Sequence, residues 1–327
     1  MPQIHRLILF KFLICESVAV FDFHTMRVAA IDLGTNTFHL LIAEKKSGGR
    51  AEFIFRKTCV VKLGREGFND GLISAKAFQR GIAAMKLFSD ALKIFKPQKA
   101  IARATSAIRN CRNGNDFISK SEKLIRNKIE IISGEREAEL IYHGVKNSFP
   151  LDSQPVLIMD IGGGSIEFII ANQSKIFWKK SIEAGAARLA EKFSLFNPAG
   201  KSEILRMNDY LRKVFTPVLA SVRKYNPKIL VGSSGSFDTF ALMTGNKNHY
   251  RKTSSEIPFK EFVALHGRLI KSTKAERLKM KGLHRMRVDM IVPASICFNF
   301  ILKETGIRKT FRSAYALKEG VIFSEIS

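Results

Sequence analysis

The sequence predicts an α/β fold built from two similar lobes with a cleft between them. Two stretches indicate a duplicated design: "AAIDLGTNTFHLLIAE" at 29–44 and "VLIMDIGGGSIEFIIA" at 156–171. In each, an apolar run ends in an aspartate, a polar turn containing glycine follows, and a second apolar run resumes, which is typical of a β-hairpin. A chain of 327 residues also exceeds what one compact core usually holds. Asp32 and Asp160 therefore mark the starts of two lobes that face each other.

The first lobe is predicted to span residues 26–148 and to alternate strands with amphipathic helices. Apolar and β-branched runs that end at glycine or polar turns predict its strands, and apolar residues at helical spacing predict its helices. The longest helix pattern stops before Pro97, where a helix cannot continue. The strands are expected at 27–34, 38–46, 51–64, 99–107 and 129–133, and the helices at 74–96, 115–128 and 134–147.

The second lobe is predicted to span residues 149–327, after a linker in "SFPLDSQP" at 148–155. Strands are expected within 156–185 and helices within 186–224. The stretch "KILVGSSGSFDTFALMTG" at 228–245 predicts a strand, a Gly-Ser loop and a helix. The remainder is mostly helical, and we expect the closing helix to pack back towards the first lobe.

The first 25 residues are not expected to belong to the folded body. Their apolar stretch is interrupted by Lys11 and Glu16, and it is too short and too charged for a membrane span. Met26 stands directly before the first strand, so we expect translation to begin there. Residues 1–25 would then be a leader or a mis-annotated extension, and a targeting role is the alternative.

The composition indicates a protein that attracts polyanions. The formal net charge is +25, and long-range attraction of this kind is weakened by salt. Charge alone does not choose between nucleic acid, a membrane surface and polyphosphate, but no nucleic-acid-binding motif is visible. The four cysteines are scattered and form no CxxC pair, which argues against a zinc site or a disulfide scaffold and favours the cytoplasm.

The hairpin turns themselves indicate phosphate binding. Turns rich in glycine and small hydroxyls leave backbone N–H groups pointing outward, where they bind anions. An aspartate beside such a turn would repel phosphate unless a cation lies between them, and Mg²⁺ favours carboxylates, water and phosphate oxygens together. A third loop, Gly232-Ser233-Ser234-Gly235, precedes a helix and offers a further anion site. The alternative is that these glycines only allow tight turns.

Five stretches, taken in order, resemble the exopolyphosphatase / guanosine pentaphosphate phosphatase (Ppx/GppA) family. They are "AAIDLGTNTFHLLIAE", "ARATSAIRN", "IEIISGEREAELIYHGV", "LIMDIGGGSIEFII" and "LVGSSGSFDTFA", and "SAYALKEGVIF" is similar to the family's closing helix. The resemblance covers roughly residues 26–325. It implies a duplicated actin-like (ribonuclease H-like) fold with the active site in the interlobe cleft. The helical extension of the long family members is missing, so the resemblance is to a short, two-domain form.

The resemblance also implies roles for individual acids. Glu137 matches the glutamate that activates the attacking water, and Glu167 matches a second catalytic carboxylate. Asp160 and Asp32 match positions expected to hold the metal. Helix 134–147 carries three acids, and the alternative for each is a solvated helix face.

Phosphate contacts are expected from Arg109, which suits bidentate pairing with phosphate, and from the three loops. Its alternative is an ordinary surface arginine. The chain departs from the family pattern at Glu139, where many members have a basic residue, and at Ile166, where threonine is common. The loop residues expected to bind phosphate are Gly34, Thr35, Asn36, Gly162, Gly163, Gly164, Ser165, Gly232, Ser233, Ser234 and Gly235.

The function implied is hydrolysis of a phosphoanhydride in one cleft, with Mg²⁺ or Mn²⁺ as cofactor. The substrate would be inorganic polyphosphate, guanosine pentaphosphate (pppGpp) or both, and a cytoplasmic homodimer is expected from the resemblance. No specific nucleic acid or membrane partner is expected. Two alternatives stay open: a kinase of the same superfold that uses ATP, and a non-catalytic regulator that binds polyphosphate or the alarmone.

Overall fold

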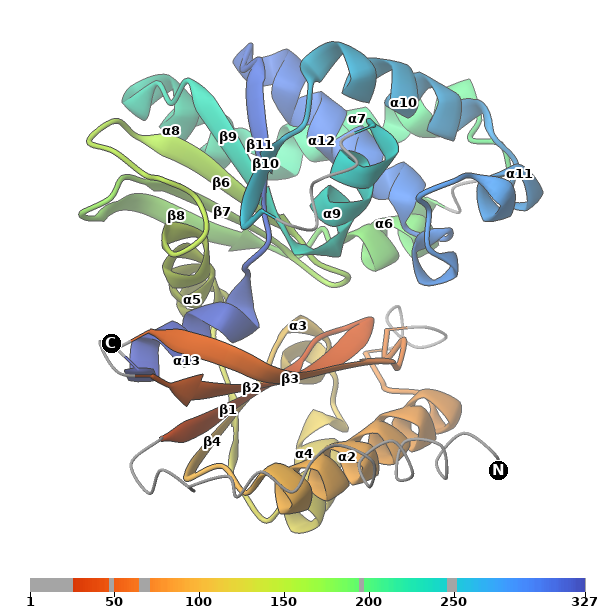
Figure 1. The fold of residues 1–327 in the computed structure, drawn as a ribbon. Helices are drawn as coiled ribbons and strands as arrows, with labels where there is room; N and C mark the ends of the chain where they lie inside the picture. Colours follow the sequence, from red (N-terminus) through yellow and green to blue (C-terminus); the bar gives the residue numbers. More distant parts are fainter. Residues whose placement is uncertain (1–25, 47–49, 65–70, 194–196, 246–251, 327) are drawn as a thin grey trace.

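The computed structural model forms two lobes, each a mixed β-sheet with helices packed on it (Figure 1). The expectation for residues 1–25 lies outside the described residues. Among the described residues, no helix is both long and apolar enough to cross a bilayer. The structure describes residues 26–46, 50–64, 71–193, 197–245 and 252–326.

The first sheet has the strand order β3-β2-β1-β4-β5. Strand β1 pairs antiparallel with β2 and parallel with β4, so it occupies the centre and is buried on both faces. Helices α2 and α4 pack on each other over one face, and their apolar side chains form one core with those of the sheet. The elements are β1 (Arg27–Leu33), β2 (Thr37–Lys45), β3 (Ala51–Val60), α2 (Ala75–Phe95), β4 (Lys99–Ala104), α3 (Ser106–Asn110), α4 (Gly114–Ile125) and β5 (Ile129–Ile131).

The second sheet has the order β10-β11-β9-β6-β7-β8 and repeats the first. Strands β6, β7, β8, β9 and β11 take the places of β1, β2, β3, β4 and β5, and β10 is added at the edge. This repeated topology confirms the predicted duplicated, actin-like two-lobed fold. The strands are β6 (Val156–Ile161), β7 (Ile166–Ala171), β8 (Ile176–Ile182), β9 (Ile229–Ser233), β10 (Ser254–Glu256) and β11 (Lys309–Ser313).

The helices of the second lobe enclose a phenylalanine-rich core. The rings of Phe262 and Phe298 lie 4.3 Å apart, and those of Phe237 and Phe298 lie 4.8 Å apart. This packing fixes α9 and α12, whose ends reach the cleft. The helices are α6 (Ala186–Phe193), α7 (Lys201–Val214), α8 (Thr216–Tyr225), α9 (Ser234–Met243), α10 (Phe259–Lys271), α11 (Lys274–Lys279), η3 (Arg285–Arg287) and α12 (Ile291–Thr305).

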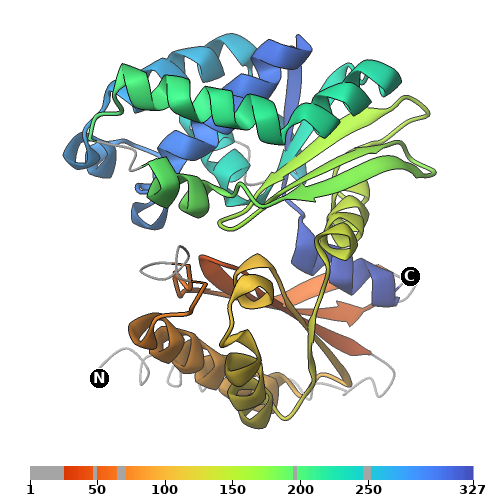
Figure 2. The same ribbon diagram turned by 180° about the vertical axis from the view of Figure 1, so that it is seen from behind.

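Two helices cross between the lobes (Figure 2). Helix α5 (Gly134–Lys146) follows the first sheet but packs against β7 and β8 of the second. Helix α13 (Leu317–Ile326) follows the second sheet but packs against β1 and β2 of the first. The two helices touch at glycines: a Cβ atom on Gly320 would lie 1.7 Å from the Leu140 carbonyl oxygen, and one on Gly144 would lie 2.3 Å from the Ala316 carbonyl oxygen.

The helix crossing predicts that Gly320→Ala destabilises the fold. The added methyl group meets backbone, which cannot rotate away, so we expect the free energy of unfolding to fall by about 1–3 kcal/mol or more. Gly267→Ala in α10 is the control, because a Cβ atom at that position would have no neighbour within 4 Å outside its own helix, and helix propensity favours alanine there. Urea unfolding of both variants measures the difference. Equal stability of the two would contradict the role of the crossing.

Candidate functional site

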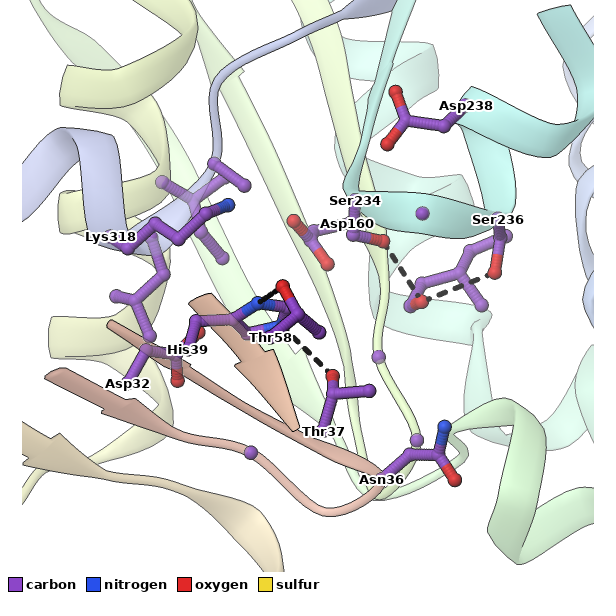
Figure 3. A pocket seen from close by; sticks show the side chains of 18 of the residues that line it. Asp32, Asn36, Thr37, His39, Thr58, Asp160, Ser234, Ser236, Asp238 and Lys318 are labelled. Carbon is purple, nitrogen blue, oxygen red and sulfur yellow. Dashed lines mark hydrogen bonds between the residues drawn. The ribbon is translucent and has the colours of Figure 1, made fainter. Parts of the chain in front are cut away.

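A cavity of about 670 Å³ lies between the lobes, where the two aspartate hairpins meet the start of α13 (Figure 3). Most of the residues predicted from the sequence line it, although they come from β1, α5, β6, β7, α9 and the two hairpin turns. They are Asp32, Gly34, Thr35, Asn36, Glu137, Asp160, Gly162, Gly163, Gly164, Ser165, Glu167, Ser234 and Gly235. The duplicated hairpins therefore bring the two halves of the chain to one site.

The tips of the two hairpins are in contact with each other. A Cβ atom on Gly164 would lie 2.5 Å from the Thr35 hydroxyl and 2.5 Å from the Ser106 hydroxyl, so only glycine fits between these side chains. Each turn is closed by a backbone hydrogen bond, from the Gly34 N–H to Thr37 at 3.2 Å and from the Gly162 N–H to Ser165 at 3.1 Å. The polar turns thus form one continuous edge of the cavity.

Four of the carboxylates that line the cavity come from the hairpins and α5: Asp32, Glu137, Asp160 and Glu167. Burial raises the pKa of Asp32 to about 7. Burial and then the charge of Asp160 raise the pKa of Glu167 to about 8. Burial and then Glu167 raise the pKa of Glu137 well above its usual range, and burial also raises the pKa of Asp160. Concentrated negative charge of this kind favours a bound cation.

Glycine and serine residues position these acids. Helix α5 begins directly against β8, because a Cβ atom on Gly134 would lie 2.3 Å from Cβ of Ser181. The Ser181 hydroxyl donates a hydrogen bond of 2.7 Å to Glu167, so the start of α5 and Glu167 are held by the same residue. Glu137, in the first turn of α5, is therefore brought towards Glu167.

Arg109 lies beside the cavity and does not line it. Its guanidinium donates to Glu137 at 3.3 Å, to Glu183 at 3.0 Å and to the Ile132 carbonyl at 2.8 Å. Glu183 also accepts a hydrogen bond from Ser106 at 2.6 Å, so this network joins α3 of the first lobe to the second lobe. The structure thus shows Arg109 as a partner of Glu137, and its contact with phosphate stays a prediction.

Gly232 and Ser233 also lie outside the lining of the cavity. A Cβ atom on Gly232 would lie 1.9 Å from the Phe237 ring, so this glycine is explained by core packing. Ser233 is fully buried and its hydroxyl donates a hydrogen bond to Asp160. The next two residues of this loop, Ser234 and Gly235, do face the cavity.

The two departures from the family pattern lie away from the cavity chemistry. Glu139 is half-buried outside the lining and forms ion pairs with Arg136 and Lys179, whose hydrogen bonds lower its pKa. Ile166 is fully buried in the core of the second lobe. Glu139 therefore contributes to the contact between α5 and β8, and Ile166 contributes to core packing.

The sequence reasoning missed the cations of the cavity. Lys318, in the first turn of α13, points into the cavity towards Asp160 and Asp238 (Figure 3). Although burial opposes it, Glu319 and Asp32 raise the pKa of Lys318, so the side chain is charged. Arg287 also lines the cavity. From the sequence alone, its motif "RMRVD" at 285–289 leaves a structural ion-pair role and a place in the cleft equally open.

His39 is a neutral member of the site. It pairs with Asp32 in the β1–β2 register, and its ring nitrogens lie 2.9 Å from the Thr37 hydroxyl and 3.0 Å from the Thr58 hydroxyl. Burial and then the charge of Lys318 lower its pKa well below the usual range. The imidazole therefore serves as a hydrogen-bonding group.

The donor set fits a cation that takes part of its coordination from substrate. Among the described residues, no three His, Cys, Asp or Glu side chains are arranged to hold a metal ion by themselves. Mg²⁺ does not require such a cluster, because it commonly binds one or two carboxylates together with waters and phosphate oxygens. The acids and the anion-binding turns lie on one cavity, which matches that mixed coordination.

Comparison with known proteins places this chain among phosphatases. A model described as the Ppx/GppA phosphatase family matches residues 41–327. An exopolyphosphatase structure from Cytophaga hutchinsonii is 35% identical, with a TM-score of 0.88, and the match covers 92% of this chain and 98% of that one. A structure of the Aquifex aeolicus PPX-GPPA enzyme is 25% identical, with a TM-score of 0.77, over 92% and 99% of the two chains.

A curated protein of Haemophilus influenzae, named "Putative exopolyphosphatase", is 28% identical over 297 residues, which are 91% of this chain and 90% of that protein. The chain belongs to the Ppx/GppA phosphatase family. The family resemblance seen in the sequence motifs is therefore confirmed.

The raised pKa of Asp32 predicts that Asp32→Asn stabilises the protein free of divalent cations as pH rises. The folded-state pKa of about 7 lies above the unfolded value near 3.8. Ionising Asp32 therefore costs stability between these values, and the full cost, up to about 4 kcal/mol, is reached above pH 7. The variant should gain stability at pH 8 and little at pH 4, measured by urea unfolding with a chelator present.

The control for this measurement is Asp90→Asn. Asp90 is exposed on α2 and pairs with the exposed Lys93 at 3.2 Å, so its replacement should change stability by less than about 1 kcal/mol at both pH values. An Asp32→Asn gain that is the same at pH 4 and pH 8 would exclude burial of the charge as its cause.

Proposed function

We propose that the protein hydrolyses the terminal phosphoanhydride bond of inorganic polyphosphate, releasing orthophosphate. The observation that carries this proposal is a buried glutamate, Glu137, on the same cavity as two glycine-containing turns, of a kind whose backbone N–H groups bind phosphate. The names of the Cytophaga and Haemophilus relatives support polyphosphate as substrate. Guanosine pentaphosphate stays as a second substrate to be tested, because it presents the same terminal anhydride.

In the proposed reaction, Glu137 orients a water molecule and takes its proton as the water attacks the terminal phosphorus. The raised pKa of Glu137 suits a general base, provided that the side chain is ionised in the substrate complex. Arg109 holds the carboxylate in place through its 3.3 Å hydrogen bond. Glu167 lies close enough to raise the pKa of Glu137 and shares in positioning the water.

Substrate phosphates would be held by the turn amides and by Lys318. The 34–36 and 162–165 turns line the cavity from opposite lobes, and Ser234 and Gly235 line it at the start of α9. The N–H groups of Gly34 and Gly162 close their own turns, so the other backbone N–H groups of these segments would donate to substrate phosphates. The charged Lys318 side chain offsets negative charge on the phosphates. A phosphate chain bound in this way contacts both lobes.

We propose that Asp160 and Asp32 hold a divalent cation, Mg²⁺ or Mn²⁺, with substrate oxygens completing its coordination. When bound, the cation would neutralise charge on the phosphates and lower the pKa values of the surrounding acids. We also propose that the protein is a cytoplasmic homodimer. Each subunit would then contain a complete site, because every group invoked here comes from one chain.

The test is phosphate release by the full-length protein with Mg²⁺, offered long-chain polyphosphate, guanosine pentaphosphate and ATP in parallel. Glu137→Gln should lower kcat about a hundredfold or more, because loss of a general base costs that much. Glu135→Gln is the matched control: Glu135 is exposed in the same helical turn, and the charge change is identical. Tight binding without release from any substrate would indicate a regulator in place of a hydrolase, and turnover of ATP with a small acceptor would indicate a kinase.

Removal of divalent cations should abolish phosphate release, and Mg²⁺ should restore it. Asp160→Asn removes one proposed ligand, so the Mg²⁺ concentration for half-maximal activity should rise about tenfold or more. Asp209→Asn, at an exposed position on α7, is the control. A Mg²⁺ requirement that is identical in wild type and Asp160→Asn would exclude Asp160 as a ligand.

A further inference from the structure

Glu319 carries a fully buried carboxylate that is not part of the cavity lining. It is the third residue of α13, directly after Lys318. Three groups surround the carboxylate: the backbone N–H of Ala316 at 2.9 Å, the ammonium of Lys318 at 3.2 Å and the guanidinium of Arg56 at 3.5 Å. A buried charge is tolerated only when it is compensated in this way. The proposed reaction uses Lys318 but gives Glu319 no role.

Arg56 of β3 lies on the side of the first sheet that α13 covers. The strand register pairs Arg56 with Leu41, whose side chain belongs to the core that α13 shares. Paired residues of antiparallel strands point to the same face, so Arg56 faces α13. Its guanidinium also lies 4.6 Å from the centroid of the Phe53 ring, and Phe53 packs on Phe323 of α13 with centroids 6.0 Å apart. Glu319 is therefore held from the first sheet as well as from its own helix.

Lys318 lies where a positive charge is unfavourable. It is in the first turn of α13, at the end of a helix where the backbone dipole disfavours cations. Burial tends to lower the pKa of Lys318, and the charge of Glu319 raises it most, ahead of Asp32. The hydrogen bond of 3.2 Å also fixes where the ammonium group lies. Glu319 therefore supports both the charge and the position of Lys318.

The alternative role for Glu319 is to cap the helix. Its carboxylate accepts the N–H of Ala316, the residue before α13, as the third residue of a helix does in a capping box. Glutamine serves at that position as well as glutamate, so the cap alone does not require a charge. The nearby Lys318 and Arg56 do require one. Glu319→Gln separates the two roles.

We propose that Glu319 is a positioning residue that holds the Lys318 ammonium group charged and directed into the cavity, where it binds substrate phosphate. This inference rests on the proposed function. An ammonium group has three N–H donors, and the hydrogen bond to Glu319 uses one of them. The others can be offered to phosphate oxygens from the position that Figure 3 shows. Glu319 therefore orients the cation without blocking it.

The experiment measures phosphate release from long-chain polyphosphate by the full-length protein with Mg²⁺, in wild type and Glu319→Gln. KM should rise about tenfold, because the variant keeps the cap but weakens a charged contact with phosphate. The value of kcat should change much less, because Lys318 contacts phosphate before and during the reaction. The matched control is Glu325→Gln, which removes the same charge from the end of α13, where Glu325 pairs with Lys99. It should behave as wild type.

A double-mutant cycle tests whether Glu319 acts through Lys318. Lys318→Gln removes the cation but still offers the buried carboxylate a neutral donor. In that background, Glu319→Gln should change KM by less than about twofold, because the cation that it positions is absent. An equal effect in both backgrounds would overturn the proposal. So would an unchanged or lowered KM in Glu319→Gln, or an equal effect of Glu325→Gln.

If the wild type binds polyphosphate but releases no phosphate, the proposed hydrolysis is wrong and the positioning role is still decided. Calorimetric titration of the same variants with long-chain polyphosphate then replaces the kinetics. A dissociation constant that rises about tenfold in Glu319→Gln, but not when Lys318→Gln is already present, supports the role. An unchanged constant in Glu319→Gln overturns it, and absence of polyphosphate binding by the wild type overturns both proposals.

Discussion

The contact between helices α5 and α13 is the constraint on which the rest of the site depends. Each helix follows the sheet of one lobe in the chain and packs on the sheet of the other. Because glycines let the two backbones touch, the first turns of both helices reach the cleft together. One of these turns supplies Glu137 and the other supplies Lys318. A buried carboxyl group and a half-buried cation thus come from a single packing arrangement that also joins the lobes.

The fold holds the acids of the cavity where ionising them costs free energy. A strongly basic chain could have surrounded these carboxylates with lysines, yet their pKa values are raised mainly by burial. Serine and glycine residues hold the acids in place without neutralising them, and Lys318 and Arg109 compensate only in part. A cation and a phosphate chain bound as proposed would relieve this unfavourable energy, which would couple ligand binding to stability.

Local patterns were enough to predict the duplicated fold and most of the acids, because Asp32, Asp160 and their turns belong to continuous hairpins. Gly232 and Gly235 belong to one loop, but Gly232 packs against the Phe237 ring and Gly235 faces the cavity. Tertiary packing decides this difference, so the local sequence could not predict it. Lys318 could not be placed because its helix returns across the cleft.

The hairpins of the two lobes place Asp32 opposite His39 and Asp160 opposite Glu167, at equivalent positions of the repeated topology. Identical lobes would have produced a cavity with approximate twofold symmetry, which cannot distinguish the two ends of a linear substrate. A neutral imidazole on one side and a carboxylate on the other remove that symmetry. Divergence at this pair of positions therefore gives the two sides of the cavity different chemistry, so that, under the proposed function, the terminal phosphate and the rest of a substrate would meet different groups.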